Sequence, residues 1–418
     1  MNVNDSEKIN HLLKEGGLSR TENQEDANLI IVNSCAVREK AQEKIFSFIG
    51  RLRKDQKVVV SGCVAQSEKD NILKRNGNVD FVMGTHQFYQ INEIINDYIL
   101  KSKKGTKTTF RQTWSETVPD AMARNNKYTG FISIMEGCNN FCTYCIVPFT
   151  RGREKYRPFK NVMDEVDYLT NKGFREIVLL GQNVNSWKDS DNNISFPILL
   201  EKIAENDKVK WIRFITSYPG YYESELIDVM KRNRNIARHV HFPAQSGSTR
   251  ILRKMGRNYS RQKYMEIISK FKSEIPDISF SSDFIVGFPG ETDSDFEYTL
   301  SLVRKVKYDS IFSFVYSPRK FTKAASVADT IPISVKKGRL KALQELQKEI
   351  QLSYHESLIG RNVEVMVTGK NPRKIGELLG RTESYKIVNF VGEHKPGIFI
   401  NVKIEHFGPY SLRGTTVI

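Results

Sequence analysis

At 418 residues the chain is long enough for two or three domains with full cores. Its net charge of +16 includes two basic clusters, with four lysines over Lys101–Lys107 and five basic residues against one acidic over Arg151–Lys160. Such clusters favour a polyanion, above all nucleic acid, as substrate or partner. No apolar run is long enough to span a bilayer, and residues 1–7 are too polar for a signal peptide, so we expect a reducing, cytoplasmic setting and no membrane.

The first hundred residues alternate helical and strand patterns. A helix is expected from Asp5 or Ser6 to Gly16-Gly17, and a second ends near Leu52. A third begins at Gln66, and buried strands are predicted at residues 29–32, 58–60 and 81–83. This pattern predicts a small α/β unit with a parallel sheet over residues 1–100.

Two cysteines follow two of these strands directly. Cys35 comes after the strand at 29–32, and Cys63 comes after the strand at 58–60. Functional groups collect outside the carboxyl ends of parallel strands, so the two thiols can share a metal at one edge of the sheet. Each of them alone is also compatible with an inert buried thiol.

A polar, basic and aperiodic stretch at 101–126 is interpreted as a linker. The domain that follows, 127–356, alternates strands and helices. The expected strands are 130–134, 177–180, 211–215, 239–242, 279–286 and 311–316, and the expected helices are 162–171, 197–204, 223–231, 261–272 and 296–306. Six such repeats predict an open, partial (β/α)6 barrel, in which chemistry gathers at the strand carboxyl ends.

The first strand of this domain runs into a loop with three cysteines, Cys138, Cys142 and Cys145, at C-x3-C-x2-C spacing. Three thiolates this close can hold one soft metal centre and leave one coordination position open. A closed zinc site needs a fourth Cys or His, and no His lies between His86 and His239. Disulfides are disfavoured by the odd cysteine count, and buried core cysteines do not explain the polar loop. The spacing therefore indicates an iron–sulfur site.

Beyond this domain, an amphipathic helix is expected from Val335 to Leu358, with apolar residues at helical spacing. Short alternating runs then fill residues 357–418, broken by glycine and proline. They predict a small antiparallel barrel, with nine basic residues against five acidic from Arg361 onward. By itself such a barrel is a modest indication of RNA binding.

The cysteine loop resembles the radical S-adenosylmethionine (SAM) superfamily, with Tyr144 as the aromatic residue of C-x3-C-x-aromatic-C. The resemblance implies that Cys138, Cys142 and Cys145 hold a [4Fe-4S] cluster whose fourth iron binds SAM. It also implies that SAM is cleaved to a 5′-deoxyadenosyl radical, chemistry that the cofactor supplies and the protein positions.

Three polar, glycine-containing motifs follow predicted barrel strands and are candidates for SAM contacts. Glycines allow close backbone approach, and amide or hydroxyl groups offer neutral hydrogen bonds. One such motif would be ordinary turn chemistry, whereas three at one rim favour a SAM site. The candidate residues are Gly181, Gln182, Asn183, Gln245, Ser246, Gly287 and Glu291.

Further motifs are similar to the tRNA methylthiotransferases of the MiaB type, among them Val147–Gly152, Leu180–Ser186 and Tyr316–Arg319. The chain departs from the family's usual residues at Phe242-Pro243-Ala244 and at Phe321–Ala324, which bears on substrate fit rather than on the radical step. The C-terminal segment resembles the TRAM module, an RNA-binding barrel, at Gly380–Thr382 and Val388–Phe390.

The start of the chain resembles the amino-terminal domain of the same family. There, a strand ending in Gly-Cys-Gln precedes a motif that Met1–Glu7 matches, and the first strand is missing here. In the family, that cysteine joins the equivalents of Cys35 and Cys63 in a second, auxiliary [4Fe-4S] cluster. Either Met1 is internal to the reading frame or one auxiliary ligand is absent.

The resemblance implies an enzyme that adds a methylthio group to carbon 2 of N6-isopentenyladenosine beside the tRNA anticodon. It implies the tRNA anticodon arm and an electron donor such as flavodoxin or ferredoxin as partners, and we expect a monomer. Alternatives are a sister enzyme acting on threonylcarbamoyl-adenosine or on a ribosomal protein aspartate, and a catalytically impaired tRNA-binding protein. No catalytic side chain is assigned.

Overall fold

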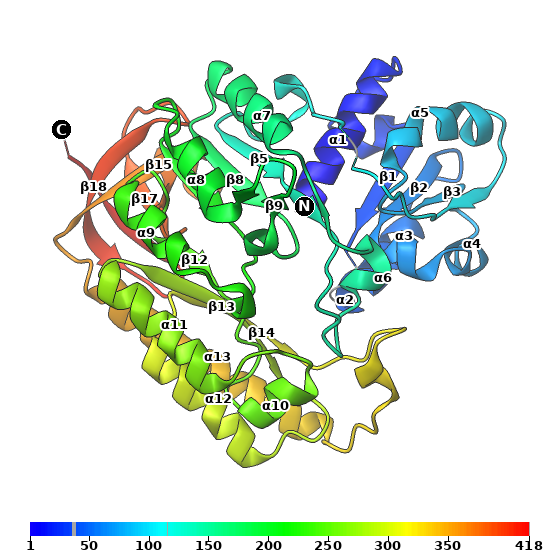
Figure 1. Ribbon diagram of the computed structural model, residues 1–418. Helices are drawn as coiled ribbons and strands as arrows, with labels where there is room; N and C mark the ends of the chain where they lie inside the picture. The colour runs from blue at the N-terminus through cyan, green and yellow to red at the C-terminus, as the bar shows by residue number, and fades with distance from the viewer. Residues whose placement is uncertain (36–38, 115, 418) are drawn as a thin grey trace. The chain divides into compact units, whose positions relative to one another are not determined.

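The computed structural model describes residues 1–35, 39–114 and 116–417. The chain divides into two compact units, which are described separately (Figure 1). The first unit comprises Met1–Asn126, Phe131–Glu165 and Ser317–Ala325. The second comprises Lys127–Gly130, Val166–Tyr316 and Ser326–Ile418.

The first unit contains a parallel sheet in the order β1-β2-β3-β4. Its strands are β1 (Leu29–Ser34), β2 (Lys57–Gly62), β3 (Phe81–Met83) and β4 (Gly105–Lys107). Its helices include α1 (Asn2–Glu15), α2 (Glu39–Ile49), α3 (Cys63–Glu68), α4 (Asn71–Arg75), α5 (Ile91–Ile94) and α6 (Val147–Arg151). The predicted α/β unit with a parallel sheet is therefore confirmed.

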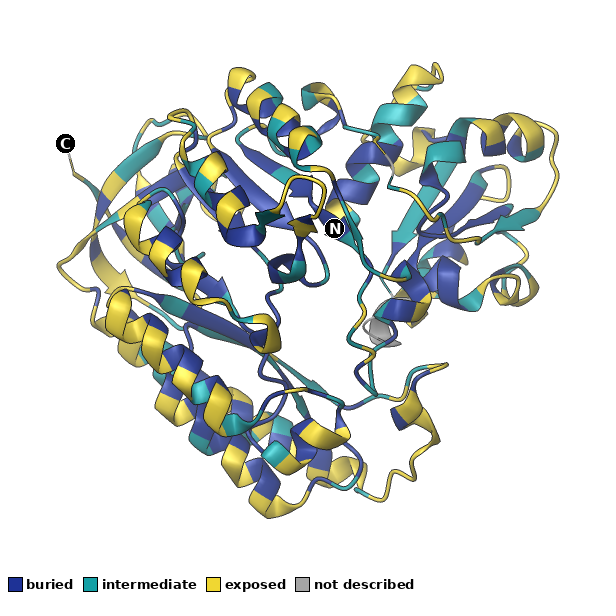
Figure 2. Ribbon diagram, viewed as in Figure 1, coloured by how far each residue is buried: buried dark blue, intermediate teal, exposed yellow. Residues whose placement is uncertain are grey.

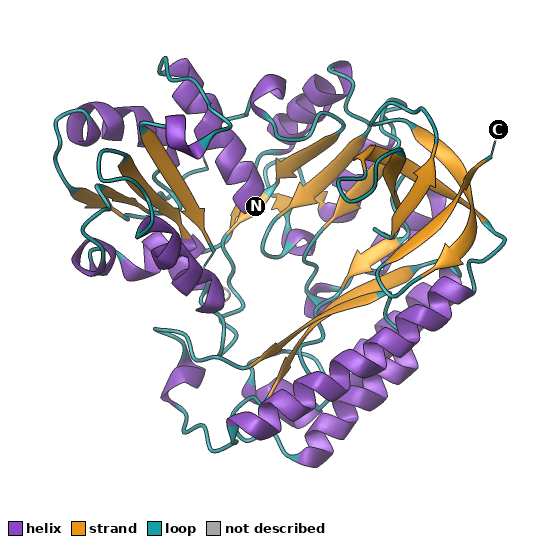
Figure 3. Ribbon diagram, turned by 180° about the vertical axis from the view of Figure 1, so that it is seen from behind, coloured by secondary structure: helices purple, strands orange, loops and turns teal. Residues whose placement is uncertain are grey.

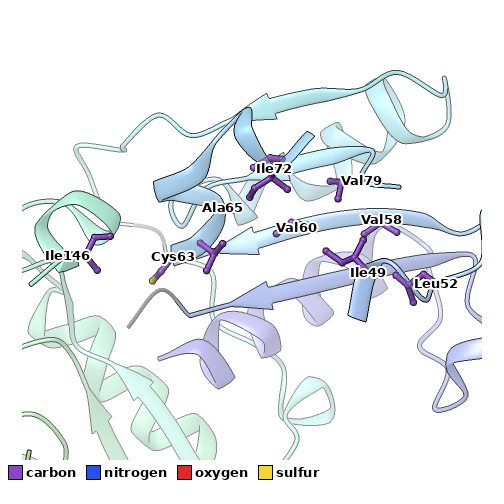
Figure 4. Close-up of a cluster of buried hydrophobic side chains, with 11 residues drawn as sticks. Ile49, Leu52, Val58, Val60, Cys63, Ala65, Ile72, Val79 and Ile146 are labelled. Atoms are coloured by element: carbon purple, nitrogen blue, oxygen red, sulfur yellow. The ribbon is translucent and has the colours of Figure 1, made fainter. Parts of the chain in front are cut away.

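Both faces of this sheet are covered, because successive residues of a strand point to opposite sides. Val58 and Val60 of β2 pack in one apolar cluster with Ile49 and Ile72, which Figure 4 shows. Val59, between them in sequence, belongs to the cluster on the other face. This explains why β2 is a continuous apolar run rather than an alternating one.

One expectation for this unit was wrong. Residues 101–126 were predicted to lack regular structure, yet Gly105–Lys107 form β4, paired with β3. The strand was missed because its three residues carry no apolar alternation. The strand forms because it pairs with β3. A Cβ at Gly105 would lie 2.8 Å from the Phe81 and Tyr98 rings, so glycine lets this strand approach β3.

The second unit holds the strand and helix repeats predicted for a partial barrel. Its parallel strands form two three-stranded sheets, β11-β8-β5 and β12-β13-β14, and an isolated bridge joins Ile212 to Ile236 between them (Figure 3). The strands are β5 (Thr129–Ser133), of which only residues 129–130 belong to this unit, β8 (Glu176–Leu180), β11 (Trp211–Phe214), β12 (His239–His241), β13 (Ser279–Val286) and β14 (Ser310–Val315).

Helices follow these strands and cover the outer side of the sheets. They are α7 (Phe159–Asn171), α8 (Phe196–Ala204), α9 (Ser224–Arg232), α10 (Thr249–Lys254), α11 (Arg261–Glu274), α12 (Asp293–Val306) and α13 (Ile333–Glu356). Figure 2 shows the buried stripe that α11, α12 and α13 turn inward and the exposed residues on their outer side. A short hairpin, β9 (Lys188–Asp189) and β10 (Ile194–Ser195), follows β8.

The C-terminal segment forms a closed barrel in the order β15-β16-β17-β19-β18. Its strands are β15 (Asn362–Lys370), β16 (Glu377–Thr382), β17 (Ile387–Val391), β18 (Phe399–Phe407) and β19 (Ser411–Thr416). The predicted barrel is confirmed, but the expectation of a wholly antiparallel one was wrong, since β17 and β19 run parallel. Local alternation identifies strands but not the partner that closes a barrel.

A buried ionic network ties this barrel to β8 and β11 within the second unit. Glu176 is fully buried and lies 2.5 Å from Arg213 and 2.5 Å from Arg381 of β16. Arg213 also donates to the Thr382 carbonyl at 3.1 Å. The barrel is thus fixed to the neighbouring sheet by the buried pair of Glu176 and Arg213 and by the partly exposed Arg381.

No helix within the described ranges has the length and apolar character needed to cross a membrane.

Candidate functional site

The three-cysteine loop of the first unit lies in a hairpin. It is closed by β6 (Met135–Glu136) and β7 (Lys155–Tyr156), which pair antiparallel. Inside the closure, the Cys138 amide donates to the Gly152 carbonyl at 3.1 Å. The side chains of Asn139 and Glu154 each accept from the other residue's amide at 3.2 Å. The loop is therefore held at its base by backbone and side-chain bonds independent of any metal.

Gly137, directly before the first cysteine, is required by this closure. Its φ is +83°, and a Cβ there would lie 2.1 Å from the Arg153 carbonyl oxygen. Phe141, inside the loop, also has a positive φ of +46°, which is costly for an aromatic residue. The Arg153 guanidinium lies 4.2 Å from the Phe141 ring centre and supports that conformation.

Among the described residues the cysteines of the loop form no disulfide, and the surroundings of Cys138 disfavour its charged form. Burial raises the pKa of Cys138 to about 11, with Glu154 and Cys142 adding to the rise, against the amide of Asn140. The Asn140 side chain donates to the Cys138 sulfur at 3.4 Å. Metal binding deprotonates a coordinating thiol, so a cation at this loop would reverse the preference for the neutral form.

Within residues 1–35, 39–114 and 116–417, no three His, Cys, Asp or Glu side chains stand in an arrangement that would hold a metal ion. The donor set nevertheless fits an iron–sulfur cluster, because three cysteine thiols lie within eight positions of a loop closed at its base. The roles of Cys138, Cys142 and Cys145 stay predictions.

The register of β1 and β2 places Cys35 and Cys63 at the same edge of the sheet. Ser34 pairs with Gly62, and each cysteine is the next residue in its strand's direction. Gly62 permits this approach: its φ is +88°, and a Cβ would lie 2.4 Å from the Ser34 carbonyl oxygen. The common edge expected from the sequence is present, and sharing of a metal there stays a prediction.

The second cysteine site and the cysteine loop lie close together within the first unit. Ile146, the residue after Cys145, packs in the same apolar cluster as Cys63 (Figure 4). Arg151, at the end of α6, is buried and interacts electrostatically with Cys63. Four of the five cysteines therefore belong to segments that pack against one another.

Arg151 also binds the first helix, where its guanidinium lies 2.5 Å from the Asp5 carboxylate and 3.2 Å from the Asn2 side-chain oxygen. Burial by itself would raise the pKa of Asp5, but the nearby Arg151 charge outweighs it and lowers that pKa. Sequence reasoning quoted Arg151 as part of a motif without assigning it a role. A buried arginine between two cysteine segments is a functional candidate that the motif could have identified.

A second polar group beside the loop was also missed. His86 accepts from the Arg111 amide at its Nδ1, and its Nε2 lies 3.0 Å from the Arg151 carbonyl oxygen. Lys155 lies 2.7 Å from Glu136, in the hairpin that closes the loop. Burial lowers the pKa of His86 although the Glu136 charge opposes it, so its ring is held neutral.

The rim residues predicted to contact SAM follow strands of the second unit. Gln245 comes after β12 with a φ of +68°, and its amide donates to the Asp283 carbonyl of β13 at 2.8 Å. Ser246 is buried and accepts from the Ser248 amide at 3.2 Å. Gly287 follows β13 with a φ of +70°. The structure thus brings the second and third motifs to the carboxyl ends of paired strands.

The remaining rim residues have different surroundings. Glu291 is buried, and its Oε2 accepts from the Gly287 amide at 2.7 Å and from Arg339 at 2.8 Å. Those bonds hold the turn after β13, so Glu291 has a structural role in addition to the predicted contact with SAM. Gly181, Gln182 and Asn183 follow β8, in the other sheet, and Asn183 is buried.

Comparison with protein families divides the chain into the same three parts. Residues 132–303 match the Radical SAM superfamily, and residues 356–417 match the TRAM domain. Residues 1–84 match a family described as Uncharacterized protein family UPF0004.

Curated relatives align with the whole chain. One is the tRNA-2-methylthio-N(6)-dimethylallyladenosine synthase of Clostridium botulinum (strain Okra / Type B1), 41% identical over 429 residues, with 100% of this chain and 95% of the relative covered. Another, of the same name, comes from Bacillus velezensis (strain DSM 23117 / BGSC 10A6 / LMG 26770 / FZB42) and is 39% identical over 99% of this chain and 83% of the relative.

Among solved structures, the radical S-adenosylmethionine methyltransferase TsrM from Kitasatospora setae, with cobalamin and a [4Fe-4S] cluster bound, has a TM-score of 0.56. It is 13% identical and covers 77% of this chain and 70% of its own. At that identity the likeness concerns the fold alone. The matched superfamily implies a [4Fe-4S] cluster and SAM for this chain.

Proposed function

This chain belongs to the family of tRNA-2-methylthio-N6-dimethylallyladenosine synthases, and on that premise we propose that it adds a methylthio group to carbon 2 of N6-dimethylallyladenosine in tRNA. The observation that carries the proposal is 41% identity over the full chain, together with a loop that retains all three closely spaced thiols. The modified nucleotide lies beside the anticodon.

We assign the SAM-binding [4Fe-4S] cluster to Cys138, Cys142 and Cys145. When bound, the cluster and SAM would supply the radical that removes the hydrogen from carbon 2. The protein's part is to hold three thiols on a loop closed by β6 and β7, with Cys142 buried and the other two cysteines partly buried. Gly181–Asn183, Gln245-Ser246 and Gly287 are assigned to SAM, with Glu291 bracing the turn.

An auxiliary [4Fe-4S] cluster is assigned to the edge that carries Cys35 and Cys63, which contribute two of its thiolates. The support is the strand register that sets them side by side. The buried Arg151 guanidinium supplies a fixed positive charge next to Cys63. In the proposed reaction, this second cluster provides the sulfur.

RNA binding is assigned to the C-terminal barrel together with the basic surface. The loop between β15 and β16 exposes Ile375 completely and carries Arg373 and Lys374, and Tyr410 is exposed between β18 and β19. Exposed cations bind phosphates, and exposed aromatic rings stack on bases. Binding to the anticodon arm should therefore weaken steeply as salt concentration rises.

The test is mass spectrometry of tRNA nucleosides from a strain that lacks the gene. We expect loss of 2-methylthio-N6-dimethylallyladenosine and accumulation of N6-dimethylallyladenosine. The wild-type gene should restore the modification, and Cys142→Ala should not. Tyr298→Ala, a change at an exposed position on α12, is the matched control and should restore it fully.

Two results would contradict the proposal. An unchanged level of the methylthio nucleoside would refute it. Loss of a methylthio derivative of threonylcarbamoyl-adenosine instead would assign the chain to the sister reaction. Anaerobic reconstitution separates the two clusters, because Cys142→Ala and Cys63→Ala should each bind about four fewer irons per chain than wild type. Loss of all iron in either variant would contradict the assignment of two separate sites.

A further inference from the structure

The inner face of the β12-β13-β14 sheet carries a group of side chains that neither the cluster nor the rim residues use. In β13, Phe280 and Phe284 point to the helix side, where the Phe280 ring lies 5.7 Å from that of Phe271 of α11. The residues between them, Ser281 and Asp283, must point the other way. That other side is the barrel's inner face, which α11, α12 and α13 do not cover (Figures 1 and 3).

Three residues of neighbouring strands meet on this inner face and are called here the base wall: His241 of β12, Asp283 of β13 and Phe312 of β14. Asp283 pairs in register with Phe312, so both side chains lie on one side of the sheet. His241 Nε2 lies 3.5 Å from Asp283 Oδ2, and the His241 and Phe312 rings are 6.1 Å apart and edge to face.

At the amino-terminal end of the same face, the polar side chains already have hydrogen-bond partners. His239 is buried, and its two ring nitrogens lie 2.8 Å from the Ser279 hydroxyl and 3.0 Å from the Ser281 hydroxyl. Burial holds its pKa well below the usual value, so the ring stays neutral. The Ser281 hydroxyl also lies 2.9 Å from His241 Nδ1. This chain of bonds fixes the His241 ring and, through it, orients the Asp283 carboxylate.

The other two residues of the base wall, Phe312 and Asp283, are partly exposed. The Phe312 ring is 50% exposed and the Asp283 side chain 32% exposed, whereas Phe280 and Phe284 on the opposite face of β13 are buried. The base wall thus offers an aromatic ring beside an oriented hydrogen-bond acceptor. Its charge is negative, which disfavours a phosphate and favours a neutral group with an N–H donor.

We propose that the base wall receives the target adenine itself, an inference that rests on the proposed function. The N6-substituted adenine has one N–H at N6, which donates to Asp283, and its five-carbon N6 chain packs against Phe312. Bound by this edge, the base directs carbon 2 away from the sheet, since carbon 2 lies across the ring from the N6 and N7 edge. His241 is a positioning residue for Asp283.

The test compares two anticodon stem-loop RNAs of one sequence, one with N6-dimethylallyladenosine at the target position and one with adenosine. Binding is measured with purified, reconstituted full-length protein by fluorescence anisotropy. Wild type should prefer the prenylated RNA about tenfold, as burial of several methylene groups would give. Phe312→Ala should bind that RNA about fivefold to tenfold more weakly and the unmodified RNA within about twofold of wild type.

Asp283→Ala should weaken binding of both RNAs about tenfold, because both adenines donate an N–H from N6. Phe312→Leu keeps an apolar side chain and should retain part of the preference. Tyr298→Ala, on the outer side of α12, is the control and should match wild type on both RNAs. The affinity for SAM, measured without RNA, should stay within about twofold of wild type in every variant.

Retention of the prenyl preference in Phe312→Ala overturns the proposal, and so does its absence in wild type. A fall in SAM affinity with unchanged RNA binding also overturns it, because the face would then belong to the adenine or amino group of SAM. The proposed function is judged separately, by the nucleoside analysis of the deletion strain. If Phe312→Ala restores the methylthio nucleoside to the wild-type level, the proposed function stands and the proposed adenine site is refuted.

Discussion

Glu176→Ala should destabilise the second unit more than any single surface change. The carboxylate is fully buried and bonds Arg213, Arg381 and the Thr129 hydroxyl, the last at 2.6 Å. Its removal leaves the Arg213 guanidinium, only 2% exposed, without its main counter-charge. Breaking one side of a buried ion pair costs about 3–5 kcal/mol. For a domain of this size that lowers Tm by roughly 6–20 °C.

The pH dependence of the same network has a definite sign. Burial would raise the pKa of Glu176, but Arg213 and then Arg381 outweigh it, and the folded pKa is below the usual glutamate value of about 4.3. The unfolded chain therefore binds the proton more readily. The stabilisation is fully present above about pH 4.3 and is lost as the pH falls through the folded pKa. Wild type should lose stability in that acidic range, and Glu176→Ala should lose less.

Urea unfolding followed by tryptophan fluorescence measures this loss of stability. Urea is uncharged, so it does not screen the ion pairs. Trp211 is a suitable probe, because its ring lies 4.7 Å from the Phe399 ring of the C-terminal barrel and 4.7 Å from the Arg213 guanidinium. Glu201→Ala, which removes an exposed pair with Arg232, is the matched control and should cost less than about 1 kcal/mol. A Glu176→Ala protein within about 1 kcal/mol of wild type would show that the network is not buried as described.

Three further predictions concern the cysteine segments. Gly62→Ala should destabilise the first unit by about 1–3 kcal/mol in urea, because its φ is +88° and the new Cβ meets the Ser34 carbonyl, whereas Gly77→Ala, with open space around it, should not. In metal-free protein, alkylation of Cys138 should reach half its maximal rate near pH 11 rather than about 8.5, and an ordinary profile would refute the burial of this thiol. Gly137→Ala should lower iron uptake on reconstitution while urea stability of the second unit is unchanged, and full uptake would show that the loop closure is dispensable.

Local signals were sufficient for most of the secondary structure. The strand at Ser279–Val286 was predicted with its observed bounds, because it holds two phenylalanines and an Ile-Val pair and is followed directly by the turn residues Gly287–Gly290. The strand at Gly105–Lys107 was not predicted, because it forms by pairing with a neighbouring strand and has no sequence pattern of its own. The parallel pairing of β17 and β19 was likewise outside local patterns, since a pairing partner is chosen by closure of the barrel.

The candidate site divides in the same way. The spacing of three cysteines in eight residues is a sequence property, and it identifies the kind of centre because the loop chemistry is local. The motif around Arg151 could have marked it as a candidate, but its contact with Asp5 was not predictable, because the two residues are distant in sequence. The same holds for the pairing of Asp283 with Phe312 at the base wall.

The order of amino acids alone therefore determined the class of fold, the three-cysteine loop and the family, because each depends on residues within a few positions of one another. The tertiary structure decided which charges are buried together and which aromatic ring faces the inside of the barrel. Those features depend on strand register and on helix packing, which bring residues together over long separations in the chain.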